Sequence, residues 1–493
     1  MEVFLESLLG VLNFNTLLLL VLGVICGISI GVLPGLTATM GVALLLPITF
    51  GMEPLPGILL LIGVYFGAVY GGSITAILIN TPGTPASAAT ALDGYPMTQK
   101  GEAHKALTIA TLSTAIGGIL SVIVLILLSP QLAGFALQFS APETFALALF
   151  GISIISSLTG KSFAKGMVAG LLGLFIATVG LDPIGGLQRF TFGSENLNNG
   201  INLIPVMIGL FAAAEAFRSV ENLFSKQNVD VVLKKVKLKW QEFKTLIATI
   251  LRSAGIGTFV GMIPGAGADI TAFIAYNEAK RFSKDKSNFG KGEIKGVAAP
   301  EAANSSLTGG AMIPMLTLGI PGDAVTAVLL GALVVQGLQP GPMLFEQNSV
   351  LVYGLFIGML IANILVLVLG LYSIKFFTKI LLIPRAILTP AILMLCAIGA
   401  YSLGNNYFDV IIMLFSGVIG YFLLKNDFPA SPLILGLILG PIMESNFRRA
   451  LVMSQGDFSI FITRPITVTL LIFAFMTLFS PILINVFKKY RRK

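Results

Sequence analysis

Apolar runs separated by short polar turns recur along the whole of this 493-residue chain. A helix needs about 20 predominantly apolar residues to cross a bilayer, and runs of this kind follow one another to the end of the sequence. The most strongly polar interruption, Arg218–Lys244, lies close to the middle. The pattern therefore predicts an all-α polytopic membrane protein made of two halves.

The apolar runs predict roughly 11–14 membrane segments, with the same plan in each half. A helical hairpin broken by Pro and Gly opens each half, further crossings follow, and one last helix ends the chain. The expected segments are 15–50, 57–92, 106–129, 143–158, 166–182, 201–217, 246–280, 300–338, 351–374, 386–404, 408–424, 429–445 and 465–487. We expect a first membrane repeat at 1–217, a basic cytoplasmic connector at 218–245, a second repeat at 246–445, and a final transmembrane helix with a basic cytoplasmic tail at 446–493.

Two short motifs of the first half return in the second half. Gly31–Ala38 (GVLPGLTA) resembles Gly261–Ala268 (GMIPGAGA), at an offset of 264 − 34 = 230 residues between the prolines. Asn80–Ala86 (NTPGTPA) resembles Gly319–Ala324 (GIPGDA), at an offset of 321 − 82 = 239. Two Pro-Gly breaks in the same order at nearly the same offset indicate an internal duplication.

Basic residues exchange sides between equivalent loops of the two halves. The loop 51–57 has no Lys or Arg, whereas its counterpart 280–295 is rich in Lys. The loop 93–105 contains two lysines, and its counterpart 339–349 contains no basic residue. Because basic loops stay on the cytoplasmic side, this exchange predicts two repeats of inverted topology.

The composition agrees with a membrane protein and excludes a soluble one. Hydrophobic residues make up 55% of the chain, charged residues only 11%, and the mean hydropathy is +0.92, whereas soluble domains carry about 25% charged residues. The net charge of +8 comes from basic residues in short loops, which indicates cytoplasmic anchors and not a nucleic-acid surface. We expect the C-terminus in the cytoplasm and the N-terminus outside; Arg448, Arg449 and Arg464 do not fit this topology, which leaves them outside.

The Pro-Gly breaks are the first candidates for chemistry. A break inside a membrane helix leaves backbone N–H and C=O groups unpaired, so it must face protein or water, and the N-terminus of the following half-helix can bind an anion. Small hydroxyl and amide side chains surround these breaks and are neutral donors suited to carboxylate oxygens; packing between helices is the alternative for each of them. The candidate substrate-binding residues are Pro34, Gly35, Thr37, Thr39, Asn80, Thr81, Gly83, Thr84, Ser87, Pro264, Gly265, Gly267, Thr271, Asn304, Ser305, Pro321 and Gly322.

Carboxylates within apolar surroundings are the second candidates, because their burial is costly unless they are used or paired. Asp269, Asp323 and Glu301 are candidates for coupling to a cation, either by binding it or by carrying a proton. A helix N-cap is the alternative for Asp269 and Asp323, and a place at the cytoplasmic interface is the alternative for Asp93 and Glu301. Glu143 is expected to be an ordinary first-turn residue.

Catalysis finds no support in the sequence. No P-loop or dinucleotide fingerprint occurs, His104 is the one histidine, and the two cysteines, Cys26 and Cys396, lie in separate apolar runs. We therefore expect no enzyme, no cofactor and no resident metal. A channel, or a lipid-handling membrane protein or enzyme, stays an alternative to a carrier.

The motifs around the breaks resemble those of the large membrane subunit of the tripartite tricarboxylate transporters, the TctA family. The resemblance runs from about residue 15 to beyond residue 340. The matching stretches are Gly31–Phe50, Tyr70–Pro96, Gly261–Lys280, Gly296–Asn304 and Gly319–Pro342.

This resemblance implies a secondary transporter that imports carboxylates such as citrate, driven by a gradient of Na⁺ or H⁺. It implies two partners, a small membrane subunit (TctB-like) and an extracytoplasmic solute-binding protein (TctC-like), in a bacterial or archaeal cell (inner) membrane. The substrate and cation site would then be carried by Pro34–Thr39 and Pro264–Thr271. An elevator-like motion would follow only by analogy with other ion-coupled carboxylate carriers.

Overall fold

The computed structural model is almost entirely helical, as the sequence predicts. It describes residues 2–33, 35–153, 163–182, 185–221, 236, 238–263, 267–372, 376 and 385–490, without the side chains of residues 163, 269, 385, 403, 404 and 479–490. Seven of the described helices are long and apolar enough to cross a membrane, and shorter apolar helices accompany them. The expectation of an all-α polytopic membrane protein is confirmed.

The described chain divides into two compact units, and each unit draws on both halves of the sequence. Unit 1 comprises Met1–Ala133 and Glu215–Leu403. Its helices are α1 (Glu2–Leu12), α2 (Phe14–Val32), α3 (Ala38–Leu45), the 3₁₀-helix η1 (Leu46–Thr49), α4 (Pro54–Ile79), α5 (Ser87–Gln99), most of α6 (Ala103–Ala136) and of α11 (Ala214–Val220), α12 (Trp240–Met262), α13 (Ala268–Phe282), α14 (Ile294–Leu318), α15 (Ala324–Val335), α16 (Pro342–Gln347), α17 (Ser349–Tyr372) and α19 (Arg385–Gly404).

Unit 2 comprises Gly134–Ala214 and Gly404–Lys493. Its elements are α7 (Ala141–Ser153), α9 (Phe163–Ala177), the antiparallel strands β1 (Gly180–Leu181) and β2 (Gln188–Arg189), η2 (Glu195–Leu197), α10 (Leu203–Met207), the π-helical turn η3 (Ile208–Ala213), α20 (Tyr407–Lys425), α21 (Ser431–Met453), α22 (Ile460–Thr463) and α23 (Pro465–Tyr490). The helix α21 packs on α7 and α9, and α23 packs on α7.

Asparagine side chains define the start of several of these helices. Asn13, Asn202 and Asn406 precede α2, α10 and α20, and each accepts a hydrogen bond from the backbone N–H two residues later. Such caps satisfy N–H groups that the first helical turn leaves free. The polar turns between apolar runs therefore act as helix starts as well as connections.

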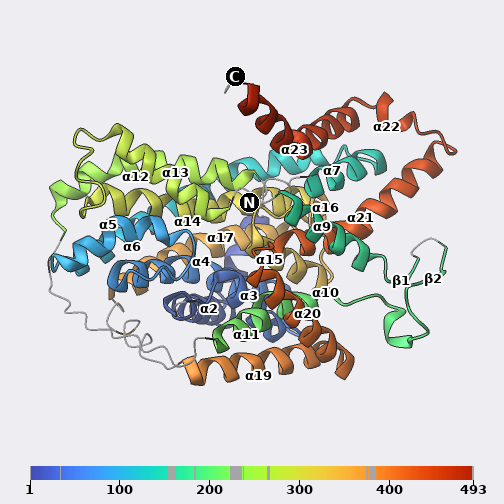
Figure 1. Ribbon diagram of the computed structural model, residues 1–493, viewed down its shortest axis with the longest axis horizontal. Helices are drawn as coiled ribbons and strands as arrows, with labels where there is room; N and C mark the ends of the chain where they lie inside the picture. Colours follow the sequence, from blue (N-terminus) through green and yellow to red (C-terminus); the bar gives the residue numbers. More distant parts are fainter. Residues whose placement is uncertain are drawn as a thin grey trace. The chain divides into compact units, whose positions relative to one another are not determined.

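Unit 1 is built around two pairs of closely packed helices, α2 with α4 and α12 with α14 (Figure 1). A Cβ atom on Gly27 would lie 2.3 Å from the carbonyl oxygen of Val64, and one on Gly257 would lie 2.2 Å from that of Ala303. Gly257 follows Gly27 by 230 residues and Ala303 follows Val64 by 239, the same offsets that relate the Pro-Gly motifs. The duplication read from the motifs therefore extends to the packing of the helices around them.

The opposite orientation of the two repeats in the membrane stays a prediction. It places the connector at Lys235 in the cytoplasm and the loop at Gln347 outside. Reporter fusions at these two positions should report opposite sides of the membrane, since the basic residues change sides between the halves. Fusions that report the same side for both would refute the inversion.

Two of the arginines that do not fit the predicted topology, Arg448 and Arg464, form ion pairs in unit 2. Arg448 pairs with Asp182 (2.9 Å) and Glu444 (2.7 Å). Arg464 donates to Oε2 of Glu143 at 2.7 Å. Glu143 lies in the first turn of α7, as expected, and is also 4% exposed, so this arginine balances a buried carboxylate.

Candidate transport site

The first break separates α2 from α3. Gly35 has a φ of +93°, a left-handed conformation that a residue with a side chain adopts at a cost. Thr37 caps α3, because its Oγ1 accepts a hydrogen bond from the N–H of Met40 at 3.2 Å. Thr39 is buried in the first turn of α3, and Pro34 lies outside the described residues. The helix interruption is confirmed, and the hydroxyl of Thr37 already serves as a cap.

The second break separates α4 from α5. Asn80 ends α4 in the left-handed region, with a φ of 54°, and Thr81 follows it. The N–H of Thr84 donates to the Oγ of Ser87 (3.3 Å), and that hydroxyl donates to the carbonyl of Thr84 (2.7 Å). The Oγ1 of Thr84 is buried and has no hydrogen-bond partner among the described residues. A buried hydroxyl without a partner is costly unless a ligand or water satisfies it.

The third break separates α12 from α13. Gly267 precedes α13 with a φ of 73°, and the hydroxyl of Thr271 donates to its carbonyl at 2.8 Å. Thr271 is fully buried. Pro264 and Gly265 lie outside the described residues, and so does the side chain of Asp269. The predicted interruption is therefore present, while the role of Asp269 stays a prediction.

The fourth break separates α14 from α15, after the left-handed Gly319 (φ 69°) and the predicted Pro321 and Gly322. Asp323 caps α15, because its Oδ1 accepts from the N–H and the hydroxyl of Thr326, both at 2.7 Å. The Oδ2 of Asp323 accepts from the hydroxyl of Tyr65 at 2.5 Å. Asp323 thus has the cap position that the sequence left open, together with a phenol partner from α4 that sequence reasoning missed.

The second and fourth breaks have the same local structure but different charges. Thr84 and Ser87 in the first half correspond to Asp323 and Thr326 in the second half, at the offset of 239. In both, the N–H of the earlier residue donates to the later hydroxyl, and the oxygen of that hydroxyl also lies close to the carbonyl oxygen of the earlier residue, at 2.7 Å in the second break and 3.0 Å in the fourth. One break therefore carries a carboxylate where the other carries an unpartnered hydroxyl.

The two breaks of each half are in direct contact. A Cβ atom on Gly83 would lie 2.3 Å from the carbonyl oxygen of Gly31, and one on Gly322 would lie 2.8 Å from that of Gly261. Only glycine allows this approach of one backbone to another. Each second break therefore packs against the end of the helix that precedes the first break.

The helices that follow the breaks also pair across the two halves. The helix α3 packs on α15, and α5 packs on α13 and α14. All four breaks therefore lie in unit 1, and the half-helix N-termini of α3, α5, α13 and α15 begin at them. Each N-terminus carries N–H groups with a partial positive charge.

The candidates Asn304 and Ser305 are buried in α14, and Ser306 follows them. A Cβ atom on Gly118 of α6 would lie 2.8 Å from the Oγ of Ser305, and one on Gly257 of α12 would lie 2.0 Å from that of Ser306. These two serines consequently fill the contacts of α14 with its neighbours. Packing explains Ser306, whereas Asn304 stays a candidate ligand.

Glu301 lies one turn before Asn304 on α14 and is 1% exposed. Its Oε1 accepts from the hydroxyls of Ser73 (2.6 Å) and Thr90 (2.5 Å), and its Oε2 accepts from that of Thr114 (3.0 Å). These three donors belong to α4, α5 and α6. Glu301 therefore lies inside unit 1 in a cage of hydroxyls, while its depth relative to the cytoplasmic interface stays a prediction.

Asp93 also lies inside unit 1, and it holds the loop between α13 and α14. Its Oδ1 accepts the N–H groups of Gly290, Gly292 and Glu293, each at 2.8 Å, and its Oδ2 accepts the hydroxyl of Tyr276 at 2.8 Å. The side chain is fully buried. Asp93 is thus an anchor between α5 of the first half and the entry to α14 of the second.

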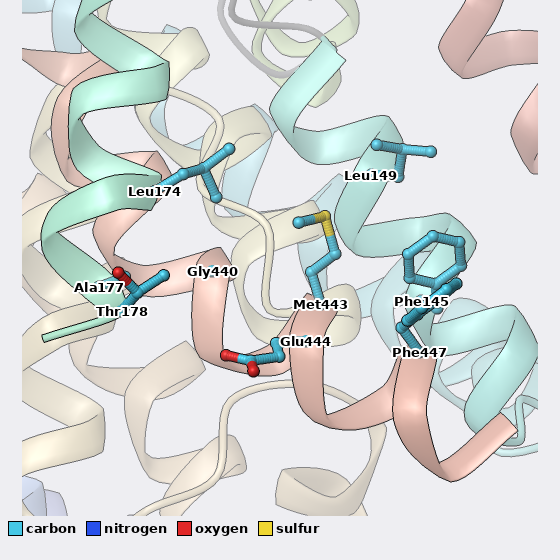
Figure 2. A pocket seen from close by; sticks show the side chains of 9 residues that line it. All are labelled: Phe145, Leu149, Leu174, Ala177, Thr178, Gly440, Met443, Glu444 and Phe447. Carbon is cyan, nitrogen blue, oxygen red and sulfur yellow. The ribbon is translucent and has the colours of Figure 1, made fainter. Parts of the chain in front are cut away.

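A cavity of about 470 Å³ in unit 2 is a poor site for a carboxylate (Figure 2). Its lining is apolar apart from Thr178 and Glu444, and Glu444 is paired with Arg189 at 2.7 Å. An anion would find few donors there and one carboxylate. The lining residues are Phe145, Leu149, Leu174, Ala177, Thr178, Gly440, Met443, Glu444 and Phe447.

Comparison with known proteins relates the chain to one protein family and to two uncharacterised relatives. Residues 17–435 match the family described as "Tripartite tricarboxylate transporter TctA family". The chain is 41% identical over 452 residues, 91% of this chain and 89% of the relative, to the "Uncharacterized 52.8 kDa protein in TAR-I ttuC' 3'region" of Agrobacterium vitis. It is also 41% identical over 215 residues, 44% of this chain and 89% of the relative, to the "Uncharacterized protein in TAR-II ttuC' 3'region" of the same organism. No solved structure matches the chain.

Proposed function

Because the chain belongs to the tripartite tricarboxylate transporter TctA family, we propose that it is the permease subunit of an ion-gradient-driven importer of tricarboxylates or related carboxylates. The family makes it a membrane subunit of a transporter. The proposal adds the substrate class, the direction of transport and the driving ion.

The observation that carries the proposal is the meeting of four interrupted helices in unit 1. A polyanion such as citrate cannot enter hydrocarbon without donors that replace its water. Half-helix N-termini and buried hydroxyls such as that of Thr84 supply such donors. The site would form around Thr37, Thr84 and Thr271, with Asn304 on the neighbouring α14.

The absence of basic residues from the breaks favours transport over storage. The stretches 31–50, 80–92, 261–271 and 319–326 contain no Lys or Arg. An arginine would hold a carboxylate tightly through a bidentate pair. Neutral donors permit release, and a co-bound Na⁺ or H⁺ would offset the charge of the substrate. Asp269, Asp323 and Glu301 are the proposed coupling carboxylates.

The proposal includes two partners and a location. A small membrane subunit (TctB-like) and an extracytoplasmic solute-binding protein (TctC-like) would complete the importer, and the binding protein would deliver the substrate. The protein would lie in a bacterial or archaeal cell (inner) membrane, with its C-terminus in the cytoplasm. No resident cofactor is proposed.

Uptake of labelled citrate tests the proposed function. The chain is reconstituted into proteoliposomes with the two partner proteins, and Na⁺ and H⁺ gradients are imposed separately. The proposal expects accumulation above equilibrium under one of the two gradients. A channel would conduct ions without citrate, and a lipid-handling protein would move or modify lipid without a coupling ion. Either of those results, with no citrate accumulation, would overturn the proposal.

A further inference from the structure

Glu301 differs from the other deeply buried glutamate described above, Glu143, in the charge of its partners. Glu143 accepts from the guanidinium of Arg464, so its negative charge is balanced. The partners of Glu301 are the neutral hydroxyls of Ser73, Thr90 and Thr114, and among the described residues no lysine or arginine forms an ion pair with it. A buried carboxylate without a countercharge is neutralised most readily by taking up a proton.

The distances around Glu301 are those of direct hydrogen bonds. The hydroxyl oxygens of Ser73 and Thr90 lie 2.6 and 2.5 Å from Oε1, and that of Thr114 lies 3.0 Å from Oε2. Two oxygens that bind the same metal ion are held apart by the ion between them, whereas direct hydrogen bonds bring them to this range. The cage therefore leaves no place for Na⁺ between these oxygens, and a proton fits it without rearrangement of the helices.

We propose that Glu301 is the proton-binding residue through which the carrier couples to H⁺. The inference rests on the proposed transport function and names its coupling ion and site. One O–H bond forms on the carboxylate when it takes a proton from water on one side of the membrane. The same bond breaks when the proton returns to water on the other side, and no other bond changes.

The position of Glu301 connects this proton to the breaks. Asn304 and Ser305 follow it by three and four residues, so they lie on the same side of α14. When Glu301 is ionised, its charge opposes a carboxylate in the neighbouring site. Protonation removes that repulsion, so proton and substrate would bind together, as symport requires.

Protonation would also change how the two halves are joined. The ionised carboxylate accepts three hydrogen bonds that tie α14 to α4, α5 and α6. A protonated carboxylic acid is itself a donor. One hydroxyl must then rotate to accept or leave the cage, and the hydrogen bonds that remain lose the strength that the negative charge gave them, which weakens the contact of α14 with helices of the other half. The proton therefore acts on helices that lead to and from the second break.

Several other titratable groups on the helices packed around α14 have partners of their own. Tyr70 on α4 shares a hydrogen bond with Thr111 (2.7 Å). Asp93 on α5 and Tyr276 on α13 bind each other. Lys105 on α6 pairs with Glu242 on α12 at 2.7 Å. These groups bind partners other than Glu301, whereas the three hydroxyls of the cage donate to Glu301 itself.

Infrared difference spectroscopy of the purified full chain in lipid tests the proton site without any transport. Spectra are recorded as the pH is lowered, and the C=O band of a protonated carboxylic acid is followed in the wild type and in Glu301→Gln. We expect one such band to be lost in Glu301→Gln and retained in Glu143→Gln, the matched buried control. In Thr90→Val the band should persist to higher pH, because the ionised form has lost a donor. A spectrum of Glu301→Gln identical to that of the wild type would overturn the proposal.

Transport by the reconstituted complex provides the second test, with labelled citrate as the probe. Glu301→Gln should lose accumulation driven by a pH gradient while it retains citrate–citrate exchange, which needs no net proton movement. Accumulation at the wild-type level under a pH gradient would overturn the proton site. If the wild-type complex moves no citrate, the proposed function fails, and the infrared comparison still decides whether Glu301 takes up the proton. If Glu301→Gln does not fold, Glu301→Asp, which keeps the carboxylate but shortens the side chain, takes its place in both tests.

Discussion

Gly257→Ala is expected to destabilise the protein by about 3 kcal/mol, the upper part of the usual range for overpacking. A Cβ atom at this position would lie 2.2 Å from the carbonyl oxygen of Ala303 and 2.0 Å from the Oγ of Ser306. The serine could rotate, but the carbonyl belongs to the backbone of α14 and cannot move alone. The helices α12 and α14 would have to separate, which would also disturb the break that follows α12. Thermal unfolding of the purified chain in detergent measures the effect.

Gly255→Ala is the matched control for this substitution. It lies two residues earlier on α12, and a Cβ atom there would meet nothing within 4 Å. Alanine is a better helix former than glycine by about 1 kcal/mol, so this variant should be as stable as the wild type or slightly more stable. Equal unfolding temperatures for Gly255→Ala and Gly257→Ala would show that the close packing of α12 on α14 is not required for the stability of the protein.

The positions of the breaks could be predicted from the sequence because their signals are local. Proline removes a backbone hydrogen-bond donor and weakens a helix, and the glycine that follows it in a Pro-Gly break, or lies close by, allows the left-handed conformation that Gly35, Gly267 and Gly319 adopt. The offsets between the motifs also predicted which helices correspond. The spacing of Gly257 and Gly261, four residues apart, is a further signal of close helix packing that is present in the sequence.

The partners of the buried carboxylates could not be predicted in the same way. Glu301 and Ser73 are 228 residues apart, and Asp93 and Gly290 are 197 apart. No periodicity within one helix indicates which distant hydroxyl or amide will face a carboxylate. For Asp323 the sequence predicts either a helix cap or a cation ligand. The capping pattern lies in the neighbouring residues, whereas Tyr65, whose hydroxyl donates to Asp323, is 258 residues away along the chain.

Asp93→Ala is expected to release the loop between α13 and α14. The substitution leaves the N–H groups of Gly290, Gly292 and Glu293 without their shared acceptor and the hydroxyl of Tyr276 without a partner. Each hydrogen bond to a charged group contributes about 1.5–3 kcal/mol, so the local free energy of opening should fall by about 3 kcal/mol or more. Amide hydrogen exchange at residues 290, 292 and 293 measures this directly in the full chain.

Asp285→Ala is the control within the same loop. Asp285 is exposed, and the hydroxyl and N–H of Ser287 lower its pKa, so it is ionised at neutral pH. Its loss should change the exchange of the three amides by no more than about 0.5 kcal/mol, as for other surface substitutions. If Asp285→Ala speeds the exchange as much as Asp93→Ala does, the loop is not held by the buried carboxylate. If only Asp93→Ala does so, a residue of the first half fixes the start of α14 and, about two helix turns further on, the position of Glu301.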